Sequence, residues 1–176
     1  IDDIGIFRTI PNMTIIVPAD AEEMTRLMPL TLEHPGPIYI RLAKGGDPIV
    51  TDAAMPFEIG KAEVFFEPDK TPDVAIIACG PLVHNALLAA RELEESGIAV
   101  RVINNHTIKP MDEKIIIKSA KDAGAVVTVE EHQIAGGMGS AVTEVLAKNH
   151  PVPIEFIGVQ NRFGESGDPF ELIEKL

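Results

Sequence analysis

The chain has 176 residues, of which 45% are hydrophobic, and a formal net charge of −12. This length is sufficient to bury a full hydrophobic core. A surface with this much negative charge repels nucleic acid and anionic lipid, so the composition excludes a protein that holds either one by charge alone. No apolar run in the sequence is long enough to cross a bilayer. We therefore expect a soluble, cytoplasmic protein that binds neither nucleic acid nor membranes.

The first 45 residues predict the end of a domain and not a whole one. In chain order they predict a strand at residues 14–17, a helix that starts at a capping box of Asp20 and Glu23, and a strand at residues 38–42. Pro29 lacks a backbone N–H and should kink or end the helix. Three elements cannot bury a core, so residues 1–45 are expected to be the trailing segment of a larger domain. Because the chain opens at Ile1 without a methionine, we expect a fragment or a processed piece.

A change of composition follows this segment. Residues 43–56 are rich in Gly, Asp, Pro and Ala without periodicity, and we place a linker at residues 46–60. Apolar runs and amphipathic stretches then alternate, which predicts strands at residues 74–78, 99–103, 125–129 and 154–157, and helices at residues 81–96, 112–123, 138–148 and from Pro169. Such alternation indicates right-handed crossovers and a mostly parallel sheet. The predicted fold is of the α/β class: a three-layer α/β/α domain at residues 61–176, preceded by a partial α/β segment.

Several single residues support this reading. Gly97 and Gly124 follow predicted helices, where a left-handed residue is common, and Asp112 can cap the second helix. Asp168, Pro169 and Glu171 are expected to start the last helix. Cys79 is the sole cysteine and follows the apolar run VAII, so it is expected to be a buried, structural residue.

The most informative stretch is residues 126–142, VVTVEEHQIAGGMGSAV, in which a strand runs into two carboxylates, a histidine, a glycine-rich turn and a helix. Folds of the α/β class place their ligand crevices at such junctions. The candidate crevice residues are Glu131, His132, Gly136, Gly137, Gly139 and Ser140. The backbone N–H groups of the turn can face an anion; alternatively, the glycines allow a tight turn and close helix packing. The spacing matches no nucleotide-binding motif.

Two further kinds of residue bear on function. Glu130 and Glu131 with His132 can do acid–base work, but no nucleophile accompanies them, so His132 is expected to be structural or to lie at a substrate's edge. Arg41 ends the run IYIR, where an arginine can hold a phosphate bidentately or form a surface salt bridge. The five histidines are scattered, so we expect no metal site and assign no catalytic residue.

Three segments, IPNMTIIVPAD, TVEEHQIAGGMGSAVTEVLA and RFGESGDPFELIEKL, together resemble the C-terminal section of the transketolase family of thiamine diphosphate enzymes. The resemblance implies the end of a pyrimidine-binding domain followed by the family's C-terminal domain. It also implies a homodimeric or split-subunit enzyme that transfers a two-carbon ketol unit between sugar phosphates with thiamine diphosphate and magnesium. Arg41 matches the family's substrate-phosphate arginine.

The departures from the family pattern define what this chain is expected to lack. No GDG motif with its downstream asparagine is present, and GGDP at residues 45–48 does not replace it. Gln160 and Asn161 stand where an acidic residue often precedes RFGESG. The chain alone is therefore expected to bind no cofactor, to be inactive, and to support homo-oligomer assembly with the remaining transketolase domains or an N-terminal subunit.

Three alternatives remain at this point. The same family resemblance extends to the beta subunits of 2-oxoacid dehydrogenases, which would change the reaction to 2-oxoacid decarboxylation. It also extends to deoxyxylulose-phosphate synthases. Independently of any family, the crevice at residues 136–140 can belong to a non-enzymatic module that binds a small anion or nucleotide.

Overall fold

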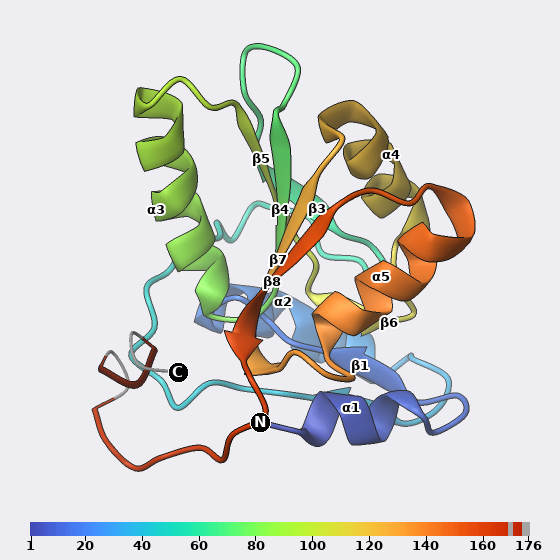
Figure 1. Ribbon diagram of the computed structural model, residues 1–176. Helices are drawn as coiled ribbons and strands as arrows, with labels where there is room; N and C mark the ends of the chain where they lie inside the picture. Colours follow the sequence, from blue (N-terminus) through green and yellow to red (C-terminus); the bar gives the residue numbers. More distant parts are fainter. Residues whose placement is uncertain (169–170, 174–176) are drawn as a thin grey trace.

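The computed structural model describes residues 1–168 and 171–173 and contains a five-stranded and a three-stranded sheet. In the larger sheet the strand order is β3-β5-β4-β7-β8. Helix α3 covers one face, and α4 and α5 cover the other (Figure 1). These elements are β3 (Glu63–Phe66), β4 (Val74–Ala78), α3 (Leu82–Glu95), β5 (Val100–Asn104), α4 (Glu113–Ala123), β7 (Val126–Gln133), α5 (Met138–Asn149) and β8 (Ile154–Val159).

Successive side chains of β4 point to opposite faces of the larger sheet. Ala75 and Ile77 belong to one buried cluster with residues of α4 and α5, whereas Ile76 and Ala78 belong to a second cluster with the apolar stripe of α3. Pairings of β4 with β5 and β7, and of β7 with β8, are parallel; β3 with β5 is antiparallel. The predicted three-layer α/β/α fold with a mostly parallel sheet is thus confirmed.

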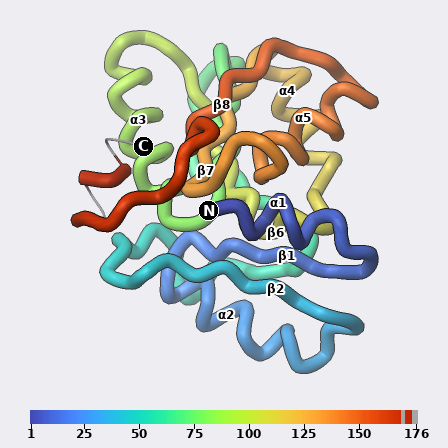
Figure 2. The backbone as a smooth tube through the Cα atoms, turned by 60° about the horizontal axis from the view of Figure 1, so that its bottom comes forward, coloured from blue at the N-terminus to red at the C-terminus, as the bar shows by residue number. Residues whose placement is uncertain are grey.

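The smaller sheet joins distant parts of the chain. Its strand order is β2-β1-β6, formed by β2 (Ile38–Ile40), β1 (Thr14–Ile16) and β6 (Thr107–Lys109). Strand β1 pairs parallel with β2 and antiparallel with β6, which follows β5 after only Asn105 and His106. Figure 2 shows the three strands side by side, with α2 (Ala21–Thr31) on one side and α1 (Asp3–Arg8) on the other. The N-terminal segment therefore shares a sheet with the later part of the chain.

Three elements were not predicted: α1, β3 and β6. Each is short, with six, four and three residues, so local periodicity hardly distinguishes it from a loop. Helix α2 continues to Thr31, and Pro29 lies inside its last turn without ending it. Of the expected last helix, residues 171–173 are helical and Asp168 accepts a hydrogen bond from the Glu171 N–H, whereas Pro169 lies outside the described residues.

The caps agree with the sequence at two other helices. Asp112 accepts a hydrogen bond from the Ile115 N–H at the start of α4, and Gly124 ends that helix with a φ of 74°. Asp20 caps α2 through the Glu23 N–H at 2.8 Å. Across residues 1–168 and 171–173, no helix has both the length and the apolar character that crossing a membrane requires.

Glu23 does not complete the predicted capping box but joins α2 to the larger sheet. Its side chain is 1% exposed and accepts hydrogen bonds from the Ala19 N–H at 2.6 Å and the Asn104 amide at 2.7 Å. Burial, together with the nearby carboxylates of Asp20 and Glu63, raises the pKa of Glu23 to about 7. A titratable group therefore lies inside the junction between α2 and the end of β5.

This placement predicts a pH-dependent effect of Glu23→Gln. Because the pKa of Glu23 rises from 4.5 to about 7 on folding, ionising it destabilises the fold progressively as the pH rises through this window. Glutamine does not titrate. Between pH 4.5 and 7.5 the free energy of unfolding of the variant should therefore rise by up to about 3 kcal/mol relative to that of the wild type. Urea unfolding at several pH values measures this difference.

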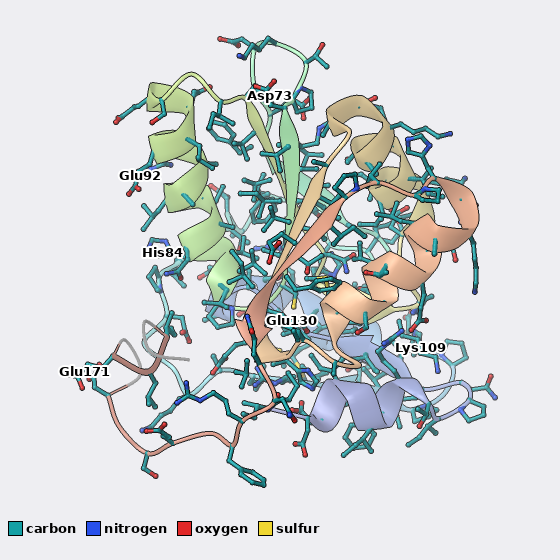
Figure 3. All side chains as sticks on the ribbon, in the orientation of Figure 1. Asp73, His84, Glu92, Lys109, Glu130 and Glu171 are labelled. Atoms are coloured by element: carbon teal, nitrogen blue, oxygen red, sulfur yellow. The ribbon has the colours of Figure 1, made fainter. Side chains whose placement is uncertain are left out.

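Glu92→Gln is the matched control, since Glu92 lies on the exposed side of α3 (Figure 3). It should reproduce the pH profile of the wild type. If Glu23→Gln also follows that profile in parallel, Glu23 does not titrate in the folded state as described.

Candidate functional site

The carboxyl edge of the larger sheet, where α/β folds usually bind ligands, is filled by the chain itself. The Val17 N–H donates to the His106 carbonyl at 2.8 Å, and the Gly80 N–H donates to the Val17 carbonyl at 3.2 Å. Gly80 has a φ of +63°, and a Cβ there would lie 2.9 Å from Cγ1 of Val17. The connection between β1 and α2 therefore closes the edge beside the ends of β4 and β5.

The buried side chain of Glu130 occupies amide donors of the glycine-rich turn after β7. This strand extends to Gln133, so the two carboxylates and the histidine lie within it. Glu130 is 1% exposed and accepts hydrogen bonds from the Met138 N–H at 2.6 Å and the Gly139 N–H at 2.8 Å. Figure 3 shows Glu130 inside the molecule near the start of α5. These first amides of the helix are the donors that an external anion would need.

Burial raises the pKa of Glu130 to about 7, although the two amide donors and the charges of Arg8 and Arg41 favour its ionised form. The glycines make room for this side chain. A Cβ on Gly137 would overlap the Glu130 carboxylate, and one on Gly139 would lie 2.5 Å from Oγ1 of Thr128. The close packing expected as one explanation of the glycines is therefore present.

Other polar groups of the turn are also bonded internally. The Gly136 N–H donates to the Ser140 hydroxyl, which donates in turn to the Ile134 carbonyl at 2.8 Å. Arg8 of α1 donates to the carbonyls of Gly136 and Gly137 at 2.9 and 3.2 Å. The turn thus serves as a contact between α1 and α5.

His132 is buried, with 1% of its surface exposed. Its Nδ1 lies 2.7 Å from the Gln133 carbonyl, which can only accept, so Nδ1 carries the proton and Nε2 faces the Gly5 N–H at 3.5 Å. Burial lowers the pKa of His132 below its ordinary value. The imidazole is therefore a neutral contact with α1.

Arg41 and Glu131, two predicted site residues 90 positions apart, come together in the structure. The Arg41 Nη1 lies 3.3 Å from Oε2 of Glu131, and its Nε lies 3.2 Å from Oδ2 of Asp3. Tyr39 donates its hydroxyl to the same Asp3 oxygen at 2.8 Å. Burial alone would raise the pKa of Asp3, but the Tyr39 hydrogen bond and the Arg41 charge hold it below its ordinary value.

A cavity of about 880 Å³ opens next to this network, between α3 and the strands β7 and β8. Its apolar walls include Leu82, Ala86, Val129 and Ile157, and Glu130 and Glu131 lie among its polar lining residues. Of the predicted crevice residues, only Glu131 lines this cavity. The remaining five lie in the packed turn or under α1.

Sequence reasoning missed Arg8, Asp3 and Tyr39, and no motif in the sequence marked them. Cys79 is buried as predicted, and burial raises the pKa of its thiol well above the ordinary range. Within residues 1–168 and 171–173, no group of three or more His, Cys, Asp or Glu side chains has an arrangement that could hold a metal ion.

Comparison with known proteins identifies the family. The model of the family "Transketolase, C-terminal domain" matches residues 60–176. The chain belongs to this transketolase C-terminal domain family. The resemblance seen in the three sequence segments is thereby confirmed.

Two relatives and one solved structure extend this result. The chain is 42% identical, over 99% of its length, to the 6-deoxy-6-sulfo-D-fructose transketolase subunit of Clostridium sp. (strain MSTE9), of which it covers 53%. It is 37% identical to 1-deoxy-D-xylulose-5-phosphate synthase of Prochlorococcus marinus (strain MIT 9313), over 99% of this chain and 27% of that protein. A split-gene transketolase, solved as an inactive β4 tetramer, matches with a TM-score of 0.94 and 43% identity, over 99% of this chain and 56% of that one. The chain thus spans about half the length of its transketolase relatives.

The packed turn predicts that Gly139→Ala destabilises the protein. The new Cβ would lie 2.5 Å from Oγ1 of Thr128 and 2.8 Å from Cδ1 of Phe156, so the start of α5 must shift. We expect a loss of about 1–3 kcal/mol in the free energy of unfolding, measured by urea denaturation.

Gly5→Ala is the control for this substitution. Its Cβ would meet the Gly136 carbonyl at an ordinary 3.5 Å, so alanine should be neutral or stabilise α1 by up to about 1 kcal/mol. Equal effects of the two substitutions would contradict the packing described for the turn.

Proposed function

We propose that this chain is the C-terminal part of a transketolase, or of a split transketolase subunit, which transfers a two-carbon ketol unit between sugar phosphates. The observation that carries this proposal is the match to transketolase subunits along 99% of the chain, at 42% identity in sequence and a TM-score of 0.94 in structure. The active protein would be an assembly of this part with the remaining transketolase domains or an N-terminal subunit, as a dimer or a larger homo-oligomer. We place it in the cytoplasm, in pentose phosphate metabolism.

The described residues do not fit the thiamine diphosphate and magnesium that this reaction requires. The amides at the start of α5 already bond Glu130, and Val17 fills the carboxyl edge of the sheet. No cluster of metal-ligating side chains occurs within residues 1–168 and 171–173. We propose that both cofactors are held by the remaining part of the enzyme.

The role proposed for this chain is structural support and one edge of the substrate site. Arg41 would bind the anionic end of the sugar, because a guanidinium matches the geometry of a phosphate or sulfonate. Its Nη2 makes no hydrogen bond or ion pair within the described part of the chain and would donate to such a group. The domain division at residues 45 and 61 stays part of this proposal.

The proposal is tested with the complete protein and its partner part. We expect ketol transfer from a ketose phosphate to an aldose phosphate that requires added thiamine diphosphate and magnesium. Absence of transfer from every ketose tested, with cofactors present, would overturn it. A second candidate, supported by the 37% identity to deoxyxylulose-phosphate synthase, predicts instead that pyruvate is the donor and that carbon dioxide is released.

Arg41→Gln should raise the KM for phosphorylated ketoses by roughly 10- to 100-fold, as expected for the loss of hydrogen bonds to a charged group. The KM for unphosphorylated ketoses should change little. Arg91→Gln, an exposed position on α3, serves as the control and should leave both values unchanged. An equal KM increase for both ketose types in Arg41→Gln would show that Arg41 does not bind the phosphate.

A further inference from the structure

The two carboxylates that pair with Arg41 are held very differently. Asp3 is 22% exposed and receives a second hydrogen bond from the Tyr39 hydroxyl at 2.8 Å. Glu131 is 41% exposed, and within the described residues Arg41 is its one hydrogen-bond and ion-pair partner, at 3.3 Å. Releasing Glu131 therefore breaks one long contact, whereas releasing Asp3 breaks a network.

The position of Glu131 makes this difference relevant to ligands. Glu131 lines the cavity of about 880 Å³, whereas Arg41, 14% exposed, does not belong to the lining. Glu131 thus contacts both the cavity and the Arg41 guanidinium. An anion bound in the cavity next to Arg41 therefore also lies near the negative charge of Glu131.

We propose that Glu131 is a displaceable counter-ion of Arg41, which a tetrahedral oxyanion at the end of the substrate replaces. The inference rests on the proposed function in assuming that this oxyanion belongs to a sugar. Asp3 would stay paired with the Nε of Arg41. The oxyanion would replace Glu131 as the acceptor of Nη1 and also accept from Nη2, in the bidentate geometry that guanidinium favours. Phosphate and sulfonate share this chemistry.

The negative charge of Glu131 should lower the affinity of the site for anions. The displaced Glu131 carboxylate continues to repel an anion bound nearby. The oxyanion takes the place of Glu131 beside Arg41, so the half-buried guanidinium keeps an anionic partner throughout the exchange. Glu131 then acts as a specificity-determining residue that weakens the binding of anions in proportion to their charge.

The direct test is anion binding to the complete protein, with inorganic phosphate and methanesulfonate as probes in calorimetric titrations. Glu131→Gln should bind phosphate roughly three- to tenfold more tightly than the wild type, and methanesulfonate, which has one charge, with a smaller gain. Glu144→Gln is the matched control, because Glu144 is also exposed and pairs with an arginine, Arg8, at 2.8 Å. It should bind both anions as the wild type does.

A double variant of Arg41→Gln and Glu131→Gln should lose the gain. The inference is overturned if Glu131→Gln binds phosphate no more tightly than the wild type, or if the gain persists in the double variant. Circular dichroism of each variant verifies the fold.

Kinetics separate this inference from the proposed function. In the assembled enzyme, Glu131→Gln should lower the KM for a phosphorylated ketose several-fold relative to an unphosphorylated one. If no ketol transfer occurs but Glu131→Gln gains anion affinity, the proposed function fails and the inference stands. If transfer occurs and anion affinity is unchanged, the inference alone fails.

Discussion

Closure of the larger sheet's carboxyl edge by Val17 is the interaction on which the rest of this structure depends. The Val17 backbone is hydrogen-bonded on one side to His106, after β5, and on the other to Gly80, after β4. Next to it, β1 pairs with β6. The bonds of Val17 join the first part of the chain to the larger sheet at the place where α/β folds ordinarily leave a crevice. The β1–β6 pairing adds a contact with the segment that follows β5.

This closure has a consequence for chemistry. The first amides of α5, which could attract a ligand phosphate, are occupied by the buried Glu130. The carboxyl edge is filled by backbone, and the glycine-rich turn packs on α1 through Arg8. The cavity lined by Glu131 stays open, and Glu131 contacts Arg41 there. In the function proposed for it, this chain contributes structural support and one substrate contact, and the other part of the enzyme holds the cofactors.

The sequence predicted the repeating parts of the fold well, because strands such as β4 and helices such as α3 have strong local periodicity and clear ends. It missed β6, since three residues between His106 and Pro110 form a strand only by pairing with β1, more than 90 positions away. In the candidate site, too, local patterns were predictable and distant contacts were not. The strand, carboxylates and glycines of residues 126–142 were recognisable, but whether Glu130 faces outward or caps α5 depends on a bond between β7 and α5 that no local pattern encodes. The pairing of Arg41 with Asp3 and Glu131 joins distant parts of the chain and could not be predicted from the sequence either.

Native-state hydrogen exchange of individual amides tests most directly whether the N-terminal segment and the parallel sheet form one unit. The account predicts that the Val17 and Gly80 amides open with the same free energy as the core amides of Ile77 and Ile103. Exchange at Val17 and Gly80 that is far faster than at Ile77 and Ile103 would show that the segment opens on its own, and would contradict the closed edge.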